Sequence, residues 1–419
     1  MREGLAGLTL RGRAFLAGGL TCVVAAVLLG HGSLARIGVL VAVLPLLAAW
    51  LLGRARYLLS LQREVTPATV AAGQPVRVEL TLTNDGRTPT GLLLLEDAVP
   101  FVLGSRPRFV LEGIGHGWRR HVSYRVRSDV RGVFQIGPMS VRVSDPFGLV
   151  ELGRAFSSTT ALTVTPRTVP LPPTSLGGSW TGSGDNRPRA FASGSAEDVT
   201  VREYRRGDDL RRVHWRSSAR VGELMVRREE QPWQSRATIV LDNRTGAHRG
   251  QGAASSLEAA VSVAASVAVH LLQHGHAVRL VTATGEETGA AWHSRDPAAD
   301  AAAVLEALAV VKAEPLAQLD ASWISEAGAG GLTVAVLGAT GDADLPYLAR
   351  LAHHSATASA ICLQVDEWSR RAEPGDDAVT RLTGRGFRAV PLGRHDDLVG
   401  VWRELGRSRR PSPTLGGGA

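Results

Sequence analysis

The stretch Val201–Pro232 reads VREYRRGDDLRRVHWRSSARVGELMVRREEQP, and it separates regions of different character. Before it come two long apolar runs and then a region in which apolar and polar residues alternate. After it, strand-like apolar runs alternate with helix-like runs. This order predicts an α+β multidomain protein: an N-terminal transmembrane helical hairpin, an antiparallel β-sandwich and an α/β domain.

Two apolar segments near the N-terminus predict a membrane hairpin within residues 1–60. Residues 14–30 and 37–52 carry no charged side chain, and each approaches the length of about 17 residues that a membrane-spanning helix needs. The flanking arginines are Arg2, Arg11 and Arg13 before the first run, and Arg54, Arg56 and Arg63 after the second. The positive-inside rule therefore predicts two spans in the inner (cytoplasmic) membrane, with the soluble domains on the cytoplasmic side.

A cleaved signal peptide is the alternative interpretation of the first apolar run. Cleavage near Ala35 would place the bulk of the chain outside the cell. The second apolar run and its basic C-terminal flank favour the hairpin.

Residues 61–170 have the period of two that is typical of β-strands. In VRVELTLTN, residues 76–84, Val76, Val78, Leu80 and Leu82 share one face. Similar runs recur between turn residues, and they predict an immunoglobulin-like antiparallel β-sandwich of about seven strands. Residues 171–232 form a Pro/Gly/Ser-rich linker followed by the charged segment.

Residues 233–406 predict an α/β (Rossmann-like) domain with a parallel sheet. The first strand, RATIVLDNR at residues 236–244, contains Asp242 close to its end. Ser255 and Glu258 have the spacing of a capping box before a long apolar helix. The tail, residues 407–419, has the composition of a disordered segment.

The composition argues against several function classes. The net charge is +8, but the basic residues are spread along the chain and no nucleic-acid-binding module is recognisable, so we expect no nucleic-acid partner. The two cysteines, Cys22 and Cys362, lack metal-ligand spacing and predict no disulfide framework. We expect no cofactor.

The charged stretch has two competing interpretations. His214 with Ser217 or Ser218 suggests a hydrolase, but no Gly-x-Ser-x-Gly elbow accompanies them. A metal site would need more ligands than this helix-like run contains. We therefore favour a knot of ion pairs between its arginines and acids that fixes the arrangement of the domains, and expect no catalytic residue.

The same stretch resembles the signature of the domain of unknown function 58 family. The residues that match in order are Arg202, Tyr204, Gly207, Asp208, Arg211, Val213, His214, Trp215, Ser218, Ala219, Arg220 and Glu229. RGVFQIGPMSVRVSDPFGLVE, residues 131–151, also resembles the upstream segment of that family.

The resemblance implies a membrane-anchored protein with a β-sandwich and a domain similar to the von Willebrand factor A fold. It implies a non-enzymatic adaptor or scaffold that acts by protein–protein contact with a MoxR-type AAA+ ATPase, in cell-envelope processes. The matched residues would then be structural or docking residues.

The A-type resemblance also raises the alternative of metal-dependent ligand binding. Such domains use Asp-x-Ser-x-Ser after the first strand. Here Asp242 matches, whereas Arg244 and Gly246 stand where the serines should be. We therefore expect a degenerate site that binds no metal, with Asp242 paired to an arginine.

Overall fold

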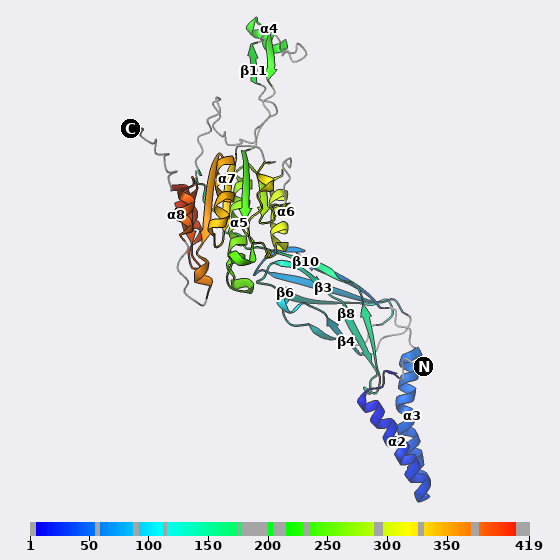
Figure 1. Ribbon diagram of the computed structural model, residues 1–419. Coiled ribbons are helices and arrows are strands. Elements are labelled where there is room, and N and C mark those ends of the chain that lie inside the picture. Colours follow the sequence, from blue (N-terminus) through cyan, green and yellow to red (C-terminus); the bar gives the residue numbers. More distant parts are fainter. Residues whose placement is uncertain are drawn as a thin grey trace. The chain divides into compact units, whose positions relative to one another are not determined.

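The structure is a computed structural model that describes residues 6–54, 59–86, 92–111, 115–174, 176, 200–203, 215–228, 235–288, 296–325, 331–369 and 377–407. These residues form a mixed α/β protein with two N-terminal apolar helices and several β-sheets (Figure 1). Contacts divide the chain into two compact units. The first comprises Met1–Val169, Arg249–Ser266 and Ala302–Ala313, and the second comprises Pro170–His248, Val267–Ala301 and Glu314–Ala419.

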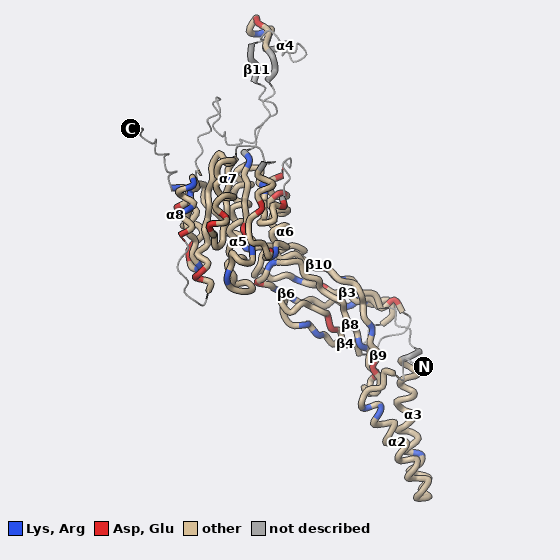
Figure 2. Tube along the Cα trace, in the orientation of Figure 1, with Lys and Arg blue, Asp and Glu red and all other residues tan. Residues whose placement is uncertain are grey.

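The first unit begins with α2 (Leu10–Leu29) and α3 (Gly32–Arg54), which are uncharged over most of their length (Figure 2). Thr9 caps α2 by accepting a hydrogen bond from the Gly12 N–H, and Gly30 ends it with a φ of 71°. The sequence-based boundaries were wrong at the connection. The second apolar run was placed at residues 37–52, but α3 begins at Gly32, so residues 32–36 belong to the helix rather than to the connection.

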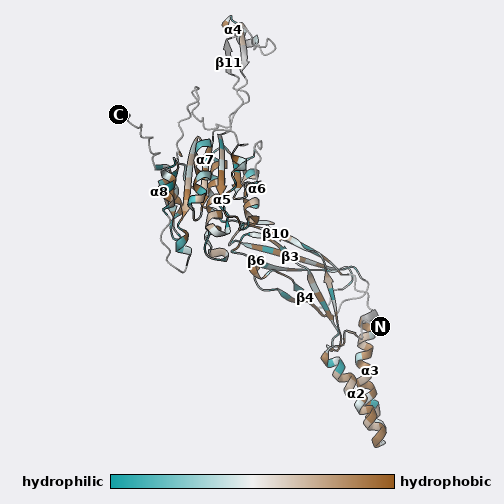
Figure 3. Cartoon of the chain, in the orientation of Figure 1, coloured by the Kyte–Doolittle hydropathy of each residue, from teal (hydrophilic) through white to brown (hydrophobic). Residues whose placement is uncertain are grey.

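Small residues allow α2 and α3 to pack closely. A Cβ atom added to Gly19 would lie 2.6 Å from the Ala42 nitrogen, and one added to Gly38 would lie 2.8 Å from the Val23 nitrogen. Both helices are long and apolar enough to cross a membrane (Figure 3). A third helix, α5 (Ser256–Gln273), also meets those criteria. However, 67% of its apolar window is buried, against 17% for α2 and for α3, so α5 is a packed interior helix.

Ten strands of the first unit form three sheets. Their orders are β1-β3-β6, β2-β10-β7 and β5-β4-β8-β9. In chain order the strands are β1 (Leu59–Thr66), β2 (Thr69–Ala71), β3 (Pro75–Asn84), β4 (Leu92–Asp97), β5 (Arg108–Leu111), β6 (Arg119–Arg127), β7 (Gly132–Ile136), β8 (Met139–Ser144), β9 (Glu151–Phe156) and β10 (Thr160–Thr165).

The alternating pattern of β3 is confirmed, because its buried residues Val76, Val78, Leu80 and Leu82 enter one core. Two details of the predicted sandwich were wrong. β2 and β10 pair in parallel, and the strand-like run of residues 132–145 divides at Gly137 into β7 and β8 of different sheets.

A buried polar cluster lies inside the first unit. The Arg63 side chain on β1 forms a bidentate ion pair with Asp97 of β4, with N–O distances of 2.6 and 3.2 Å. The Tyr124 hydroxyl of β6 donates to Asp97 at 2.6 Å. Burial, together with the hydrogen bond to Asp97 and its negative charge, raises the pKa of Tyr124 well above its usual range. The cluster therefore joins strands of two sheets.

The second unit contains a six-stranded sheet of order β15-β14-β13-β16-β17-β18. The strands are β13 (Ser235–Leu241), β14 (His276–Thr282), β15 (Glu287–Thr288), β16 (Leu332–Leu337), β17 (Thr357–Leu363) and β18 (Arg388–Leu392). All pairs are parallel except β14–β15. Counted along the chain this is the doubly wound order 3-2-1-4-5-6, whose switch point lies between β13 and β16.

Along the chain, helices alternate with these strands, as predicted: α5, α6 (Pro297–Val310), α7 (Leu345–His354) and α9 (Leu398–Arg407). A further short helix, α8 (Ala378–Thr383), precedes β18. The buried core includes Leu348 and Leu351 of α7, Leu382 of α8 and the strand residues Val240 and Ala335. The continuous apolar runs of the strands are explained by this burial. β15 and α8 were not predicted from the sequence.

His270 of α5 makes an aromatic contact within the second unit. Its ring lies 5.3 Å from that of Trp402 on α9, whose indole N–H donates to the Pro172 carbonyl at 3.0 Å. Burial is the main cause that lowers the pKa of His270 to about 4, and the nearby charge of His274 lowers it further. The imidazole is therefore neutral in the folded protein at pH 7.

We predict that Gly19→Leu separates the two apolar helices, because a side chain at this position collides with the backbone of α3. Spin labels at the exposed Leu28 and Leu40 would report a longer and broader interhelical distance in reconstituted protein that lacks Cys22 and Cys362. Gly18→Leu is the matched control, since nothing lies within 4 Å of a Cβ there. Equal distances in both variants would contradict the packing.

We predict that stability falls as the pH falls from about 6.5 to about 4, in part because of His270. Its pKa is lower in the folded than in the unfolded protein, so the unfolded protein binds the extra proton in this window. The loss is on the order of 3 kcal/mol when the transition is complete. Thermal unfolding of His270→Gln in detergent should show a flatter pH dependence than the parent. The exposed His353→Gln should retain the parent slope.

Candidate functional site

Asp242 and Arg244 follow the central strand β13 and form a local ion pair. The Arg244 Nε donates to one carboxylate oxygen of Asp242 at 2.9 Å, and Nη2 donates to the other at 2.9 Å. The Arg244 backbone N–H also donates to Asp242, at 3.1 Å. Because the chain turns immediately after β13, both side chains lie at the carboxyl end of the sheet, next to its switch point.

Asp344 completes this site from the other side of the switch point. It follows β16, and its two oxygens accept hydrogen bonds from Arg244 Nη1 at 2.7 Å and Nη2 at 3.1 Å. Nη1 donates in addition to the Ala317 carbonyl at 3.1 Å. All five N–H groups of the guanidinium are thereby used.

We name these three residues, Asp242, Arg244 and Asp344, the arginine clasp. Their exposed fractions are 0%, 5% and 3%, so water contributes little to the site. Burial disfavours a charged Arg244. The hydrogen bonds and negative charges of Asp242 and then Asp344 outweigh that cost and raise the pKa of Arg244 further above its usual range. The guanidinium is the positive charge that these two carboxylates require.

The neighbouring loops are held by further hydrogen bonds. The Asn243 side chain accepts from the Ala283 N–H at 2.9 Å, and His248 Nε2 donates to the Asp242 carbonyl at 2.6 Å. Asp342, in contrast, is exposed and lies 3.7 Å from Arg381. Across the described ranges, no group of three or more His, Cys, Asp or Glu residues has a spacing suited to a metal ion.

The signature segment is described in two pieces. β11 (Thr200–Glu203) pairs antiparallel with β12 (Met225–Arg228), and α4 (Trp215–Val221) lies between them in sequence. The residues after Gly222 form β12, and the sequence did not indicate its partner β11. Gly222 ends α4 with a φ of 83°, as expected from the sequence.

Five of the signature residues lie in described positions. Arg202 belongs to β11, while Trp215, Ser218, Ala219 and Arg220 belong to α4. Trp215 is 70% exposed. The Ser218 hydroxyl accepts a hydrogen bond from the Met225 N–H at 2.8 Å. This hydrogen bond connects α4 to the start of β12.

The remaining signature residues lie outside the described part of the chain: Tyr204, Gly207, Asp208, Arg211, Val213, His214 and Glu229. The predicted ion-pair knot and the His214 hydrolase alternative both depend on them. Both stay predictions.

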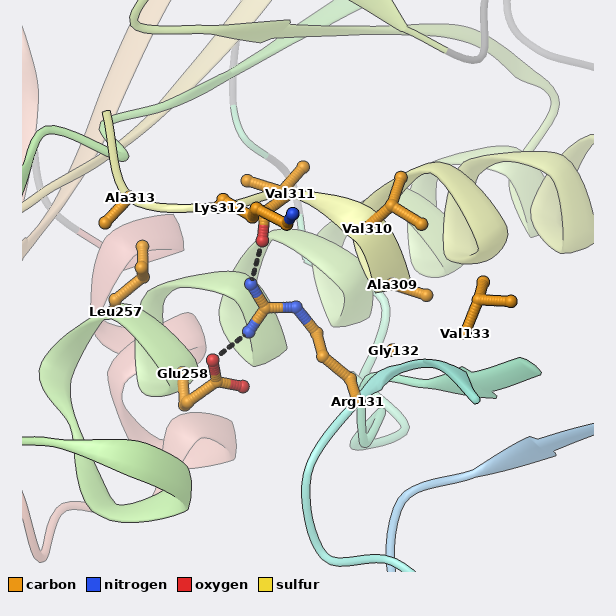
Figure 4. A pocket seen from close by; sticks show the side chains of 10 residues that line it. All are labelled: Arg131, Gly132, Val133, Leu257, Glu258, Ala309, Val310, Val311, Lys312 and Ala313. Carbon is orange, nitrogen blue, oxygen red and sulfur yellow. Dashed lines mark hydrogen bonds and ion pairs between the residues drawn. The ribbon is translucent and has the colours of Figure 1, made fainter. Parts of the chain in front are cut away.

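A cavity of about 590 Å³ lies within the first unit, lined by residues 131–133, Leu257, Glu258 and residues 309–313 (Figure 4). Arg131 extends across it and pairs with Glu258. Its Nε donates to the Leu308 carbonyl at 2.9 Å and its Nη2 to the Val311 carbonyl at 2.5 Å. Glu258 therefore pairs with Arg131 rather than closing the capping box, while Ser255 still caps α5 through the Glu258 N–H at 3.3 Å.

Sequence reasoning missed several of these residues. Asp344 lies several residues after the end of β16, and a single turn (Asp342–Asp344) brings it back to Arg244. Arg131 is the first residue of the segment 131–151 that resembles the family, and Glu258 occupies a capping-box position. The sequence around each residue therefore marked it as notable. Neither signal indicated that the two residues meet.

Comparison with protein families gives one match. Residues 200–323 match the model of the family described as "Protein of unknown function DUF58". The match includes the signature segment, Asp242 and Arg244, and it supports the resemblance drawn from the sequence. A comparison with curated protein sequences found no match.

Several solved structures share a limited likeness. The CARDB domain of a Pyrococcus furiosus protein, in complex with di-metal ions, is 15% identical, with 25% of this chain and 93% of that chain covered and a TM-score of 0.19. A chain from the complex of zinc 2-glycoprotein and prolactin inducible protein from human seminal plasma is 12% identical. The match covers 26% of this chain and 98% of that chain, with a TM-score of 0.21. With TM-scores this low, neither likeness carries an argument.

We predict that Arg244→Ser makes the site sensitive to divalent cations. Without the guanidinium, two buried carboxylates face each other, and breaking such a pair costs about 3–5 kcal/mol of unfolding free energy. Millimolar Mg²⁺ should then raise the unfolding temperature of the variant at constant ionic strength. The parent protein should not respond.

Arg381→Ser serves as the matched control, because Arg381 pairs with the exposed Asp342 near the same edge. It also loses the hydrogen bond from Arg381 to the Thr340 carbonyl, but it should gain no response to Mg²⁺. Calorimetric binding of Mg²⁺ to the parent protein, abolished by Asp242→Ala, would contradict the interpretation of the site.

Proposed function

We propose that this protein is a membrane-anchored, non-enzymatic adaptor that acts by protein–protein contact, with a MoxR-type AAA+ ATPase as its partner. In this proposal α2 and α3 cross the inner membrane, the soluble parts lie on the cytoplasmic side, and the second unit is a von Willebrand factor A-like domain. The family match, the apolar helices and the strand order support the proposal.

The arginine clasp is the observation that carries the non-enzymatic, metal-free part of the proposal. An A-type domain that binds through a metal needs an open coordination position, which the partner fills. Here every side-chain N–H group of Arg244 donates a hydrogen bond to a residue of the same unit. Contact at this edge of the sheet would therefore depend on shape and surface charge rather than on a shared ion.

The exposed Trp215 supports a docking role for the signature segment. Tryptophan is enriched among the residues that dominate the affinity of protein interfaces. α4 presents this side chain together with the exposed Arg220. In sequence, α4 lies between the two strands β11 and β12, which form a small sheet. The Ser218 hydroxyl, one of the two serines of the hydrolase alternative, accepts a hydrogen bond from the Met225 backbone N–H.

We predict that Trp215→Ala weakens binding to a purified MoxR-type AAA+ ATPase by at least about tenfold, the equivalent of about 1.4 kcal/mol. The measurement is surface plasmon resonance with the full-length protein in nanodiscs. Trp118→Ala is the matched control, since Trp118 is 63% exposed in the first unit. Absence of binding by the parent, or an equal loss in both variants, would contradict the proposed contact.

A further inference from the structure

The loop that follows β8 is fastened to the beginning of the first apolar helix. The Thr9 N–H donates to the Leu149 carbonyl at 3.0 Å, and the Glu151 N–H donates to the Gly7 carbonyl at 2.8 Å. Between them, Leu8 and Val150 form a β-bridge. The segment before α2 thus continues the backbone pairing of this loop.

The Thr9 side chain strengthens this connection. Its hydroxyl donates to the Gly148 carbonyl at 2.7 Å and accepts from the Gly12 N–H at 3.2 Å. One side chain therefore caps α2 and holds the loop. Gly12 is buried, and a Cβ atom there would collide with the Leu149 carbonyl oxygen. The loop consequently lies level with the first turn of α2.

The loop itself, Asp145–Gly148, has a defined conformation. The two carboxylate oxygens of Asp145 accept from the Val150 N–H at 2.6 Å and from the Phe147 N–H at 3.0 Å. The Gly148 N–H donates to the Asp145 carbonyl at 3.0 Å, and the φ of Gly148 is 66°. The following residue, Leu149, is buried, whereas Phe147 is 66% exposed. The exposure of Phe147 is thus fixed by the loop.

The level of this loop coincides with the expected lipid headgroup layer. Thr9 lies five residues before the uncharged run that begins at Ala14, or about 7 Å along a helix. The headgroup layer is about 5–7 Å thick on each side of the hydrocarbon core. α3 runs antiparallel with Gly38 and Ala42 against Gly19, so the turn that carries Trp50 lies level with Leu10. Tryptophan is enriched in this layer.

We propose that the loop Asp145–Gly148 is a second membrane contact, in which Phe147 enters the headgroup layer of the bilayer that α2 and α3 cross. Two apolar side chains at the same level are also exposed: Leu10 of α2 is 84% exposed and Trp50 of α3 is 43% exposed. Burial of an exposed phenylalanine removes apolar area from water, which favours the contact. The β-rich part of the first unit is thereby held against the membrane at two points.

The test uses an environment-sensitive fluorophore on Phe147→Cys in the full-length protein, with Cys22 and Cys362 replaced by alanine. The protein is reconstituted in vesicles of phosphatidylethanolamine and phosphatidylglycerol. We expect blue-shifted emission, quenching by a headgroup-depth lipid quencher and protection from aqueous iodide. The control is Phe101→Cys, because Phe101 is 94% exposed and follows Asp97, which pairs with Met139 at the opposite end of β8. It should be quenched by iodide alone.

Iodide quenching at position 147 equal to that at position 101 would overturn the proposal. Protection from both quenchers would also overturn it, because a protein surface, such as a second copy of this chain, would then cover the loop. Matching unfolding temperatures of the labelled and parent proteins in the same vesicles would show that the label leaves the fold intact.

Discussion

The burial of Arg244 between Asp242 and Asp344 is the constraint on which the carboxyl edge of the parallel sheet depends. Two carboxylates at a switch point repel each other unless a positive charge lies between them. A divalent ion would supply that charge reversibly and could be shared with a partner. Here the positive charge comes from the guanidinium of Arg244, two residues after Asp242 in the chain. This charge is covalently part of the protein and cannot dissociate. The five guanidinium N–H groups are all hydrogen-bonded within the second unit, so the three side chains satisfy one another.

Buried arginine–carboxylate pairs recur in the described parts of both units. Arg63 with Asp97 joins two sheets of the first unit, Arg131 with Glu258 crosses its cavity, and Arg244 holds the clasp. Arginine suits these positions because its planar group donates two parallel hydrogen bonds to a carboxylate and stays charged when buried. The many arginines of the chain therefore include residues on which the fold depends.

Some elements could be predicted from the sequence because one physical signal determines them. Parallel strands covered on both faces read as apolar runs, so β13, β14, β16, β17 and β18 were found. Partners of strands are decided by long-range packing, which periodicity does not report. The pairing of β12 with β11 and the division of β7 from β8 were therefore missed. Asp242 was expected to pair with an arginine, but the second carboxylate of the clasp, Asp344, depends on a turn whose course the sequence alone does not show.

The central claim is that an arginine occupies the place where an A-type domain would hold a metal ion. Anomalous diffraction from crystals of the full-length protein grown with Mn²⁺ tests it most directly, because manganese would reveal itself at an Mg²⁺ site. The account predicts continuous density for the Arg244 guanidinium between Asp242 and Asp344, with no anomalous peak there. An anomalous peak between the two carboxylates, with Arg244 displaced, would contradict it.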